Sequence, residues 1–546
     1  MPQRQLPSQL LIGCTMNHTT SVGEAVVRTL EENGIEMSFG IPGMHTLELY
    51  RGLSNSRIRH VVPRHEQACA FMADGYARAS GKPAACFIIT GAGLTNAGTG
   101  IAQATADSSP MLVISSVGST SDLSMQRARL HELKAQSAMM APLVAWSHTL
   151  LSGSNLPIVV ARAFGTFSAN RPQPVHIEIP LDVLKEEYKA ELNIPRKVPI
   201  GAPNPDAIDQ AVELLRAAQS PVIIVGGGAR HAADEVTELA ERLGAPVVST
   251  VAGSGILPDS HPLCLGATLP MQQTCDLIAG SDLALVVGTQ LAECDHWKPR
   301  IPLDGKIVRV DIDEAMLTGD YGGDVLLKCD AQLALRALLD AGFKCSDGHR
   351  RDVEARVRHL RDAIHESIVD ERPAHMKIIE GIRQALPNNG ILVGDMTQVA
   401  YTANMMFPAY LPRTIIHPSG YGTLGFALPA AIGACLADVG RPVVALIGDG
   451  GLQFTIQELA TAADLGLPLP IVLYNNQAYA EIRDGMRRNA IAEIGVDLQN
   501  PDFQKLANSY GCGYQRPRTV ADLVSAIEDA LKGSSPTVIE VCDGIE

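Results

Sequence analysis

Two side chains that suit a metal ion each follow a short apolar run in the C-terminal third of the chain. Asp449 comes shortly after the run Val443–Ile447, and Asn476 comes shortly after the run Ile471–Tyr474. Between them, Thr455–Leu465 has apolar residues at helical spacing. A strand–helix–strand unit places its two strands side by side and parallel. We therefore expect Asp449 and Asn476 to meet at the carboxyl edge of one sheet, where open α/β sheets bind ligands.

The residue types at this edge suit a magnesium ion and a phosphate group. Asp449 and Asn476 offer hard oxygen ligands, and Mg²⁺ takes its remaining ligands from water and substrate phosphate. Gly448, Gly450 and Gly451 allow the backbone to approach a diphosphate, whose charge the following helix start favours. The alternative is an ordinary turn at a strand end. The ordered strand–helix–strand spacing favours the metal and diphosphate site.

Bulk composition limits the range of possible functions. A chain of 546 residues is too long for one core and predicts several domains. A net charge of −15 disfavours a nucleic-acid partner, and no apolar run is long enough to cross a membrane. The 11 cysteines are scattered, which indicates neither a zinc site nor a disulfide framework. These features predict a cytoplasmic protein, with residues 1–16 as a loose leader.

The chain is interpreted as three α/β units, each with a doubly wound parallel sheet. The expected domains are 17–185, 200–345 and 365–546. A polar link that contains prolines separates the first two, and a soft, charged segment, Asp347–Arg361, ends the second.

Two further segments in the first unit have possible chemistry. Glu66 follows the strand-like Val61–Pro63 at the start of a helix, and Gly91–Asn96 is a glycine-rich turn from strand to helix. Taken alone, the first is equally a helix-start carboxylate and the second an ordinary tight turn.

Five blocks in order resemble the acetolactate synthase, pyruvate oxidase and 2-oxo-acid decarboxylase family of thiamine diphosphate (ThDP) enzymes. The resemblance implies a pyrimidine-binding domain, a Rossmann-like middle domain and a diphosphate-binding domain. It also implies that ThDP lies between the first domain of one subunit and the third domain of another. A homodimer is then the minimum active unit, and a homotetramer is expected. The blocks are residues 64–83, 91–96, 171–183, 420–434 and the unit from Asp449 to Asn476.

The resemblance gives each matching residue a role. Glu66 resembles the glutamate that shares a proton with N1′ of the aminopyrimidine. The backbone oxygen of Gly422 resembles the acceptor for N4′, and Leu424 the bulky residue that bends the cofactor. The Mg²⁺ ligands are Asp449, Asn476 and the backbone oxygen of Ala478. Further cofactor contacts are expected from Pro42, Gly43, Asn96, Thr397, Gln398, Gly448, Gly450, Gly451 and Tyr479.

The family reaction is the loss of CO₂ from a 2-oxo acid, after which two outcomes are possible. Protonation of the remaining carbon gives an aldehyde, whereas its attack on a second oxo acid makes the enzyme a carboligase such as acetolactate synthase. Leu424, His131 and Gly485 stand where the synthases have methionine, glutamine and tryptophan. The middle domain lacks the Arg-Phe-Asp-Asp-Arg run of the flavin-binding synthases, and the Gly226–Gly228 triplet alone is more often a tight turn. Decarboxylation is therefore favoured, and FAD is not expected.

One branch of the family resembles this chain most. The segments Phe39–Tyr50 and Arg129–Leu133 resemble the 5-guanidino-2-oxopentanoate (2-ketoarginine) decarboxylases of bacterial arginine catabolism, which form 4-guanidinobutanal. His131, in the second segment, is the candidate that moves a proton near neutral pH, although a lone histidine is commonly a core residue.

A guanidinium tail requires a carboxylate partner. We hypothesise that Glu481, which lies just past Asn476, is that partner and that Ile482 is a second substrate contact. Asp484, Glu48 and Asp295 are alternatives, and a solvated helix face is an equal explanation for Glu481 and Asp484. A carboligase and a non-catalytic ThDP-binding homologue stay open as further possible functions.

Overall fold

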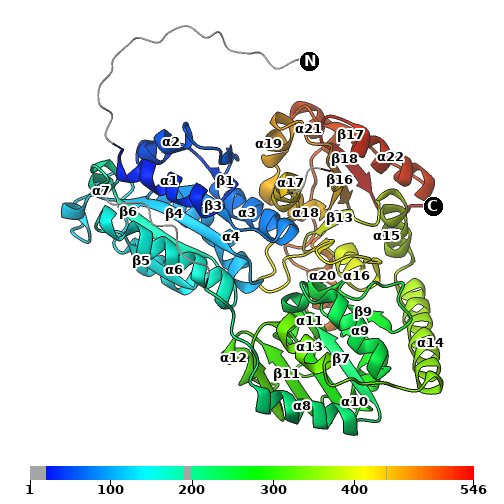
Figure 1. Ribbon diagram of the computed structural model, residues 1–546. Helices are drawn as coiled ribbons and strands as arrows, with labels where there is room; N and C mark the ends of the chain where they lie inside the picture. The colour runs from blue at the N-terminus through cyan, green and yellow to red at the C-terminus, as the bar shows by residue number, and fades with distance from the viewer. Residues whose placement is uncertain (1–19, 190–197, 438–439) are drawn as a thin grey trace.

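Three six-stranded parallel sheets follow one another along the chain, and helices cover each of them (Figure 1). The computed structural model describes residues 20–189, 198–437 and 440–546. The proposed leader and residues 17–19 of the expected first domain lie outside the described residues. The prediction of three doubly wound α/β units is confirmed, whereas the domain limits stay a prediction. Within the described ranges, no helix has the length and apolar character needed to cross a membrane.

The first sheet has the strand order β2-β1-β3-β4-β6-β5. Ser21 begins the first helix through a reciprocal capping box with Glu24, as its position before an amphipathic run predicts. The strands are β1 Met37–Gly40, β2 Arg59–Val61, β3 Ala84–Ile88, β4 Met111–Val117, β5 Trp146–Thr149 and β6 Val175–Pro180. The helices are α1 Val22–Glu32, α2 Leu47–Leu53, α3 Glu66–Ser80, α4 Ala92–Ala106, α5 Gln136–Met140, α6 Leu156–Ala169 and α7 Leu181–Lys185.

The second sheet has the order β12-β11-β10-β7-β8-β9 and its own apolar core. The strands are β7 Pro221–Val225, β8 Val247–Ser249, β9 Cys264–Gly266, β10 Leu283–Val287, β11 Lys306–Asp311 and β12 Val325–Lys328. The helices are α8 Pro205–Ala217, α9 Ala233–Leu243, α10 Gln272–Ala279, α11 Glu293–His296, α12 Glu314–Leu317 and α13 Ala331–Leu339.

The third sheet has the order β14-β13-β15-β16-β18-β17. The strands are β13 Ile391–Gly394, β14 Ile415–Ile416, β15 Val443–Gly448, β16 Pro470–Tyr474, β17 Gly513–Gln515 and β18 Thr537–Val541. The helices are α15 Pro373–Ala385, α16 Gln398–Met406, α17 Ala427–Ala437, α18 Asp449–Thr455, α19 Glu458–Asp464, α20 Ala480–Arg488, α21 Phe503–Ser509 and α22 Val520–Lys532.

The charged segment after the middle domain is a long helix rather than a soft linker. Asp347–Arg361 forms the first part of α14, Asp347–Glu371, which runs beside the middle domain toward α15 (Figure 1). Val357, Ile364 and Ile368 are buried at helical spacing along it. A narrow apolar stripe is therefore enough to dock a helix whose other residues are mostly charged.

The helix expected at Thr455–Leu465 is also different in the structure. Helix α18 begins at Asp449 itself, and a second short helix, α19, begins at Glu458. Glycines are tolerated in the first turn of α18 because tertiary packing, more than propensity, stabilises helices in proteins.

The first and third domains share one apolar core through helices α3 and α17. Every residue from Ala68 to Ala79 in α3 is buried, which is unusual for a helix that covers a sheet. The two helices touch through glycines: a Cβ on Gly433 would collide with the carbonyl oxygen of Met72, and one on Gly75 with that of Ala430. Backbone contact of this kind joins the two domains rigidly.

Gly433→Ala is expected to lower the melting temperature by about 1–3 °C, because overpacking a core costs typically 1–3 kcal/mol and no flexible side chain is available to move here. Differential scanning fluorimetry measures the change. Gly201→Ala is the matched control, since its new Cβ has no atom within 4 Å. Equal melting temperatures for the two variants would contradict the proposed rigid contact.

Candidate active site

Asp449 and the Asn475–Asn476 pair lie at neighbouring strand ends of the third sheet. Strands β15 and β16 are parallel, and their register places Gly448 opposite Tyr474. Asp449 and Asn475 are the next residues along each strand. The two strand ends meet at this carboxyl edge as expected, whereas the pairing of Asp449 with Asn476 as metal ligands stays a prediction.

Asn500 joins the two strand ends. Its Nδ2 donates to Oδ2 of Asp449 at 2.6 Å and to Oδ1 of Asn475 at 2.9 Å. Burial raises the pKa of Asp449, while hydrogen bonds from Asn500 and from the N–H of Gly450 act in the opposite direction. Sequence reasoning missed Asn500, because it lies in an irregular segment with no motif to mark it.

The loop that carries the remaining expected metal ligands is held by a returning segment. Ala478 forms a β-bridge with Asp497, and the N–H of Tyr479 donates to the carbonyl of Val496 at 2.8 Å. Gln477 has a positive φ of 56°, which turns the chain between Asn476 and Ala478.

The donor set fits a hard cation. Asp449, Asn476 and the carbonyl of Ala478 supply oxygen only, with one negative charge among them. No group of three or more His, Cys, Asp or Glu side chains gathers in the described residues, so a softer, fully protein-bound metal has no cage there. Mg²⁺ needs only a few protein oxygens and takes the rest from water and phosphate.

Two helices begin at the carboxyl ends of the adjacent strands β13 and β15. Helix α16 starts after Thr397 and α18 after Gly448, and in the described structure neither N-cap residue uses its side chain to cap its helix. The free N–H groups at such helix starts favour an anion. A diphosphate therefore fits this edge.

The glycines beside Asp449 are required by protein packing. A Cβ on Gly448 would lie 2.9 Å from Oγ1 of Thr397, and one on Gly450 would lie 2.7 Å from the ring of Tyr479. A Cβ on Gly451 would lie 2.8 Å from the carboxylate of Asp395. Thr397 and Tyr479, which are both expected to contact the cofactor, therefore lie close against α18.

Asp395 is a buried carboxylate that organises the segment with Gly422 and Leu424. It accepts hydrogen bonds from the backbone N–H of Met396 at 2.9 Å, Gly425 at 3.1 Å and Ala427 at 2.8 Å. Burial raises its pKa to about 6, and these N–H groups oppose the rise. Sequence reasoning missed Asp395, although a second Gly-Asp step after an apolar run was a visible signal.

Asp395→Ala is expected to destabilise the protein by about 3 kcal/mol or more, because it leaves buried N–H groups without an acceptor. Asp395→Asn keeps one acceptor oxygen and is expected to lose about half as much. Denaturant unfolding followed by circular dichroism measures both variants. Equal losses in the two variants would contradict the hydrogen-bond explanation.

Glu66 lies at the start of α3 and contacts the start of α4. The Nδ2 of Asn96 donates to Oε2 of Glu66 at 3.0 Å, and a Cβ on Gly93 would lie 3.2 Å from Oε1 of Glu66. Strands β2, β1 and β3 are adjacent and parallel, so the segments that follow them share one edge. The glycine-rich turn and the carboxylate are thus brought together as expected.

His131 and Pro42–Gly43 lie at the same edge of the first sheet. A Cβ on Gly91 would collide with the carbonyl of His131, and one on Gly43 would lie 2.5 Å from Cδ1 of Ile89. The ring of His131 is 5.3 Å from that of His45 and nearly perpendicular to it. Burial lowers the pKa of His45, and the charges of His131 and Lys185 lower it further.

The two groups of expected cofactor residues, around Glu66 in the first domain and around Asp449 in the third, are called the half-sites. No hydrogen bond or ion pair of the described residues joins Glu66, Asn96 or His131 to Asp449. Glu458 is a residue of the third domain that contacts the segment just before Glu66. Its carboxylate accepts hydrogen bonds from the backbone N–H of Arg64 at 3.0 and 3.2 Å. Asp449 begins α18 and Glu458 begins α19. Along a continuous helix, two residues with this sequence separation would be about 13 Å apart.

The turn with Gly422 and Leu424 contacts the opposite end of α4. The hydroxyl of Thr423 donates to Oε1 of Gln103 at 2.9 Å. Gln103 lies two helical turns from Asn96, or about 10 Å along the axis. The contacts of Glu66 and of the Gly422 turn therefore lie at different turns of α4.

The expected substrate residues lie on α20. Glu481 and Asp484 both accept from Nε2 of Gln398, at 3.1 and 2.9 Å, whereas Ile482 is 57% exposed. The remaining candidate carboxylates lie far from α20 in the fold. Glu48 pairs with Arg51 on α2, and Asp295 accepts from the N–H of Ala292 in the middle domain, where burial raises its pKa to about 7.

The glycine triplet of the middle domain serves close packing of two turns. A Cβ on Gly228 would lie 2.8 Å from the Cα of Gly288, and the N–H of Gly228 donates to the carbonyl of Gly288 at 2.9 Å. A cavity of about 650 Å³ borders these turns, with Arg230 and Asp311 in its lining. The expectation that no FAD binds stays a prediction.

Family models match a part of each of the three domains. The model described as "Thiamine pyrophosphate enzyme, N-terminal TPP binding domain" matches residues 20–139. The model of the central domain matches residues 208–338, and that of the C-terminal TPP binding domain matches residues 395–541. The two half-sites described above thus fall within the domains whose models are described as TPP-binding.

Curated relatives match over nearly the full length. "Probable 2-ketoarginine decarboxylase AruI" of Pseudomonas aeruginosa is 45% identical over 96% of this chain and 94% of its own. The acetolactate synthase isozyme 1 large subunit of Escherichia coli is 30% identical, with 95% and 93% covered. The acetolactate synthase large subunit of Lactococcus lactis is 31% identical, with 96% and 92% covered. The chain therefore belongs to the thiamine pyrophosphate enzyme family.

Proposed function

We propose that this protein decarboxylates 5-guanidino-2-oxopentanoate to 4-guanidinobutanal and CO₂, with ThDP and Mg²⁺ as cofactors. The observation that carries the proposal is the 45% identity, over 96% of the chain, to a protein named as a 2-ketoarginine decarboxylase, which is the same substrate under another name. The reaction would belong to arginine breakdown in the cytoplasm. The carboxylates on α20 near the metal loop support a cationic substrate.

The residues of the third domain would hold the diphosphate end of the cofactor. Asp449, Asn476 and the carbonyl of Ala478 would bind Mg²⁺, and the starts of α16 and α18 would receive the phosphates. Gly422 and Leu424, fixed through Asp395, would contact the rings. ThDP supplies an electron sink for the carbon that loses CO₂.

The residues of the first domain would handle protons. Glu66, oriented by Asn96, would hold a proton against N1′ of the aminopyrimidine. His131, beside His45, would deliver a proton to the carbon left by CO₂, which yields the aldehyde. Gly91 permits this because only glycine allows the His131 backbone to pass so close to the start of α4.

A second copy of the chain would complete each site. Two observations support a homodimer as the minimum active unit: no hydrogen bond or ion pair of the described residues joins the half-sites, and Glu66 and the Gly422 turn contact different turns of α4. Large apolar side chains stay exposed around both halves, such as Met44 at 76%, Phe454 at 48% and Ile494 at 77%. A homotetramer is the expected full assembly.

The second candidate is a carboligase that joins two 2-oxo acids. The full-length acetolactate synthase relatives at 30–31% identity favour it. A third candidate, a protein that binds ThDP without catalysis, is disfavoured because Glu66, Asp449 and Asn476 are all present.

Product analysis separates the first two candidates. Purified protein with ThDP and Mg²⁺ is given 5-guanidino-2-oxopentanoate, pyruvate or a branched 2-oxo acid, and the products are identified by mass spectrometry. We expect 4-guanidinobutanal and CO₂, with little turnover of pyruvate. A five-carbon hydroxy-oxo acid from pyruvate would instead establish the carboligase.

A further inference from the structure

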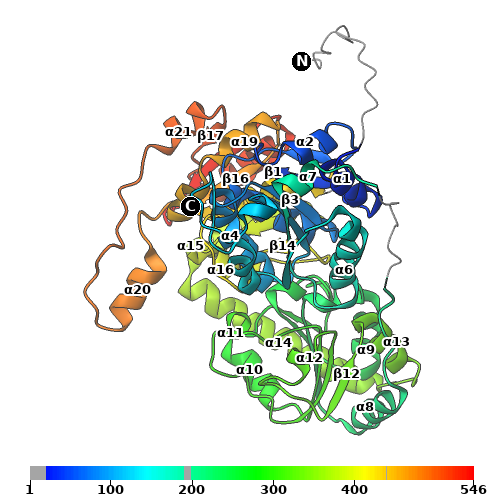
Figure 2. The ribbon, with the colours of Figure 1, turned by 90° about the vertical axis from the view of Figure 1, so that its left-hand side faces the viewer.

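One face of helix α20 carries two carboxylates and a guanidinium. Glu481, Asp484 and Arg488 are spaced at i, i+3 and i+7, which places them on one side of the helix. Helix α20 begins shortly after Ala478, an expected metal ligand. With the segment that follows it, α20 extends away from the body of the chain (Figure 2).

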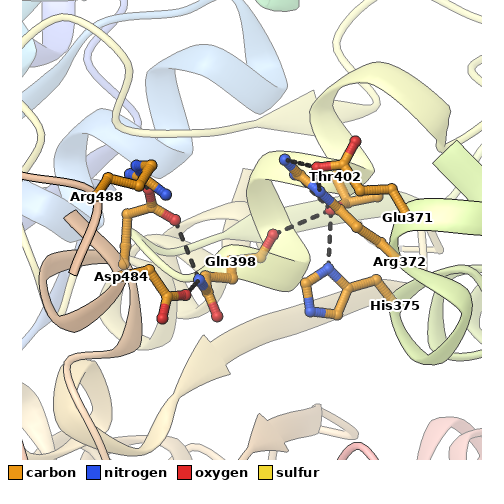
Figure 3. A network of polar contacts seen from close by, with 8 residues as sticks. Glu371, Arg372, His375, Gln398, Thr402, Asp484 and Arg488 are labelled. Carbon is orange, nitrogen blue, oxygen red and sulfur yellow. Dashed lines mark hydrogen bonds and ion pairs between the residues drawn. The ribbon is translucent and has the colours of Figure 1, made fainter. Parts of the chain in front are cut away.

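Gln398 holds the two carboxylates together. Its single Nε2 group, at the start of α16, donates to Oε2 of Glu481. The same group donates to Oδ2 of Asp484 (Figure 3). Its backbone is fixed in turn, because the fully buried Thr402 donates to the carbonyl of Gln398 at 3.2 Å. A neutral amide therefore sets the spacing of two anions without neutralising either.

Each carboxylate already has a guanidinium partner: Nη1 of Arg487 lies 3.6 Å from Oδ1 of Asp484, and Arg488 pairs with Glu481. Arg488 donates from its Nη2 to Oε1 of Glu481 at 3.2 Å, and its side chain is 65% exposed. An exposed ion pair of this kind is weak, typically below about 1 kcal/mol. Another guanidinium of similar geometry can therefore easily replace Arg488 at Glu481.

We infer that Glu481 and Asp484, positioned by Gln398, bind the guanidinium tail of the substrate, and that Arg488 fills this place until the tail displaces it. The inference rests on the proposed function. A guanidinium replaces Arg488 with like chemistry, whereas a neutral tail offers no donor to Glu481 and leaves the internal pair intact. The face thus selects for a cationic tail at a small binding cost.

The variants have opposite expected effects. Glu481→Gln should raise KM for 5-guanidino-2-oxopentanoate about ten-fold, as loss of a charged hydrogen-bond partner does. Arg488→Met should lower it about two- to five-fold by removing the internal competitor. For both variants, kcat should stay within about two-fold, and so should KM for the neutral substrate 2-oxohexanoate.

Arg28→Met is the matched control, because Arg28 is 66% exposed and also pairs with a glutamate on its own helix, at 3.1 Å. Equilibrium binding of 4-guanidinobutanoate, measured by calorimetry, gives a second readout without turnover. It should weaken in Glu481→Gln and tighten in Arg488→Met.

The outcomes are separable from those of the proposed function. If the unaltered enzyme does not turn over 5-guanidino-2-oxopentanoate, the proposed function fails. If it does, but Glu481→Gln leaves the ratio of the two substrates unchanged, or Arg488→Met changes both substrates alike, only the tail site is overturned. The tail site is supported if Arg488→Met lowers KM for 5-guanidino-2-oxopentanoate and leaves the 2-oxohexanoate reaction unchanged. If Arg488 had only a structural role, its loss would not improve substrate binding.

Discussion

Glu66→Gln is expected to lower kcat by about a thousand-fold while leaving most of the ThDP binding intact. General acid–base groups contribute about 10²–10⁴ to rates, and an amide cannot exchange a proton with N1′. The glutamine has the same shape, and its oxygen can still accept from Asn96 Nδ2. In the proposed function the third domain holds the diphosphate end of the cofactor, so affinity should depend little on Glu66.

Steady-state kinetics measures the loss in rate, and titration calorimetry with ThDP and Mg²⁺ measures the affinity. Glu36→Gln is the matched control, since Glu36 belongs to the same domain but is exposed and paired with Lys82 at 2.8 Å. Full activity in Glu66→Gln would overturn the role of Glu66. Loss of all cofactor affinity would show that the variant disrupts the site rather than the proton transfer.

Asp449→Asn is expected to weaken cofactor binding by more than about a hundred-fold. Mutating an outer-shell partner of a metal site typically lowers metal affinity or activity 10–100-fold. Asp449 is expected to bind the metal directly, as the only charged ligand in the expected set, so its loss should have a larger effect. The amide keeps an acceptor for the N–H of Gly450, so the fold should survive. Its NH₂ group, however, would face either Asn500 or the metal.

The activity of the unaltered enzyme should likewise be lost with a chelator and return with Mg²⁺. Asp529→Asn, on an exposed face of α22, is the control. A variant Asp449→Asn that retains normal Mg²⁺ dependence would place the metal elsewhere. Circular dichroism distinguishes loss of the metal from loss of the fold.

Strand ends are the part of the site that sequence predicts well. The apolar runs before Asp449 and Asn475 give the strands, and the connection between them requires parallel neighbours, so their meeting follows from local pattern and handedness alone. Glu66 and the Gly91 turn are located in the same way. Each of these residues is placed by a strand that ends just before it.

Residues that act across the fold could not be found in this way. Asn500 reaches Asp449 from an irregular segment, and Asp395 collects N–H groups from residues about thirty positions further along the chain. Their roles depend on tertiary contacts that no period in the sequence records. Helix α14 was misjudged for a related reason: its few buried residues matter only because a surface is there to receive them.

The contact between α3 and α17 has a consequence for how the chain is made. Helix α3 is buried on all sides, but its partner α17 is synthesised about 350 residues later, which takes roughly 20–70 s at 5–20 residues per second. During that interval the nascent first domain presents an apolar helix face with no cover. The middle domain, which has its own core, can fold while that face waits. The first domain is therefore the part of the nascent chain most dependent on chaperone protection.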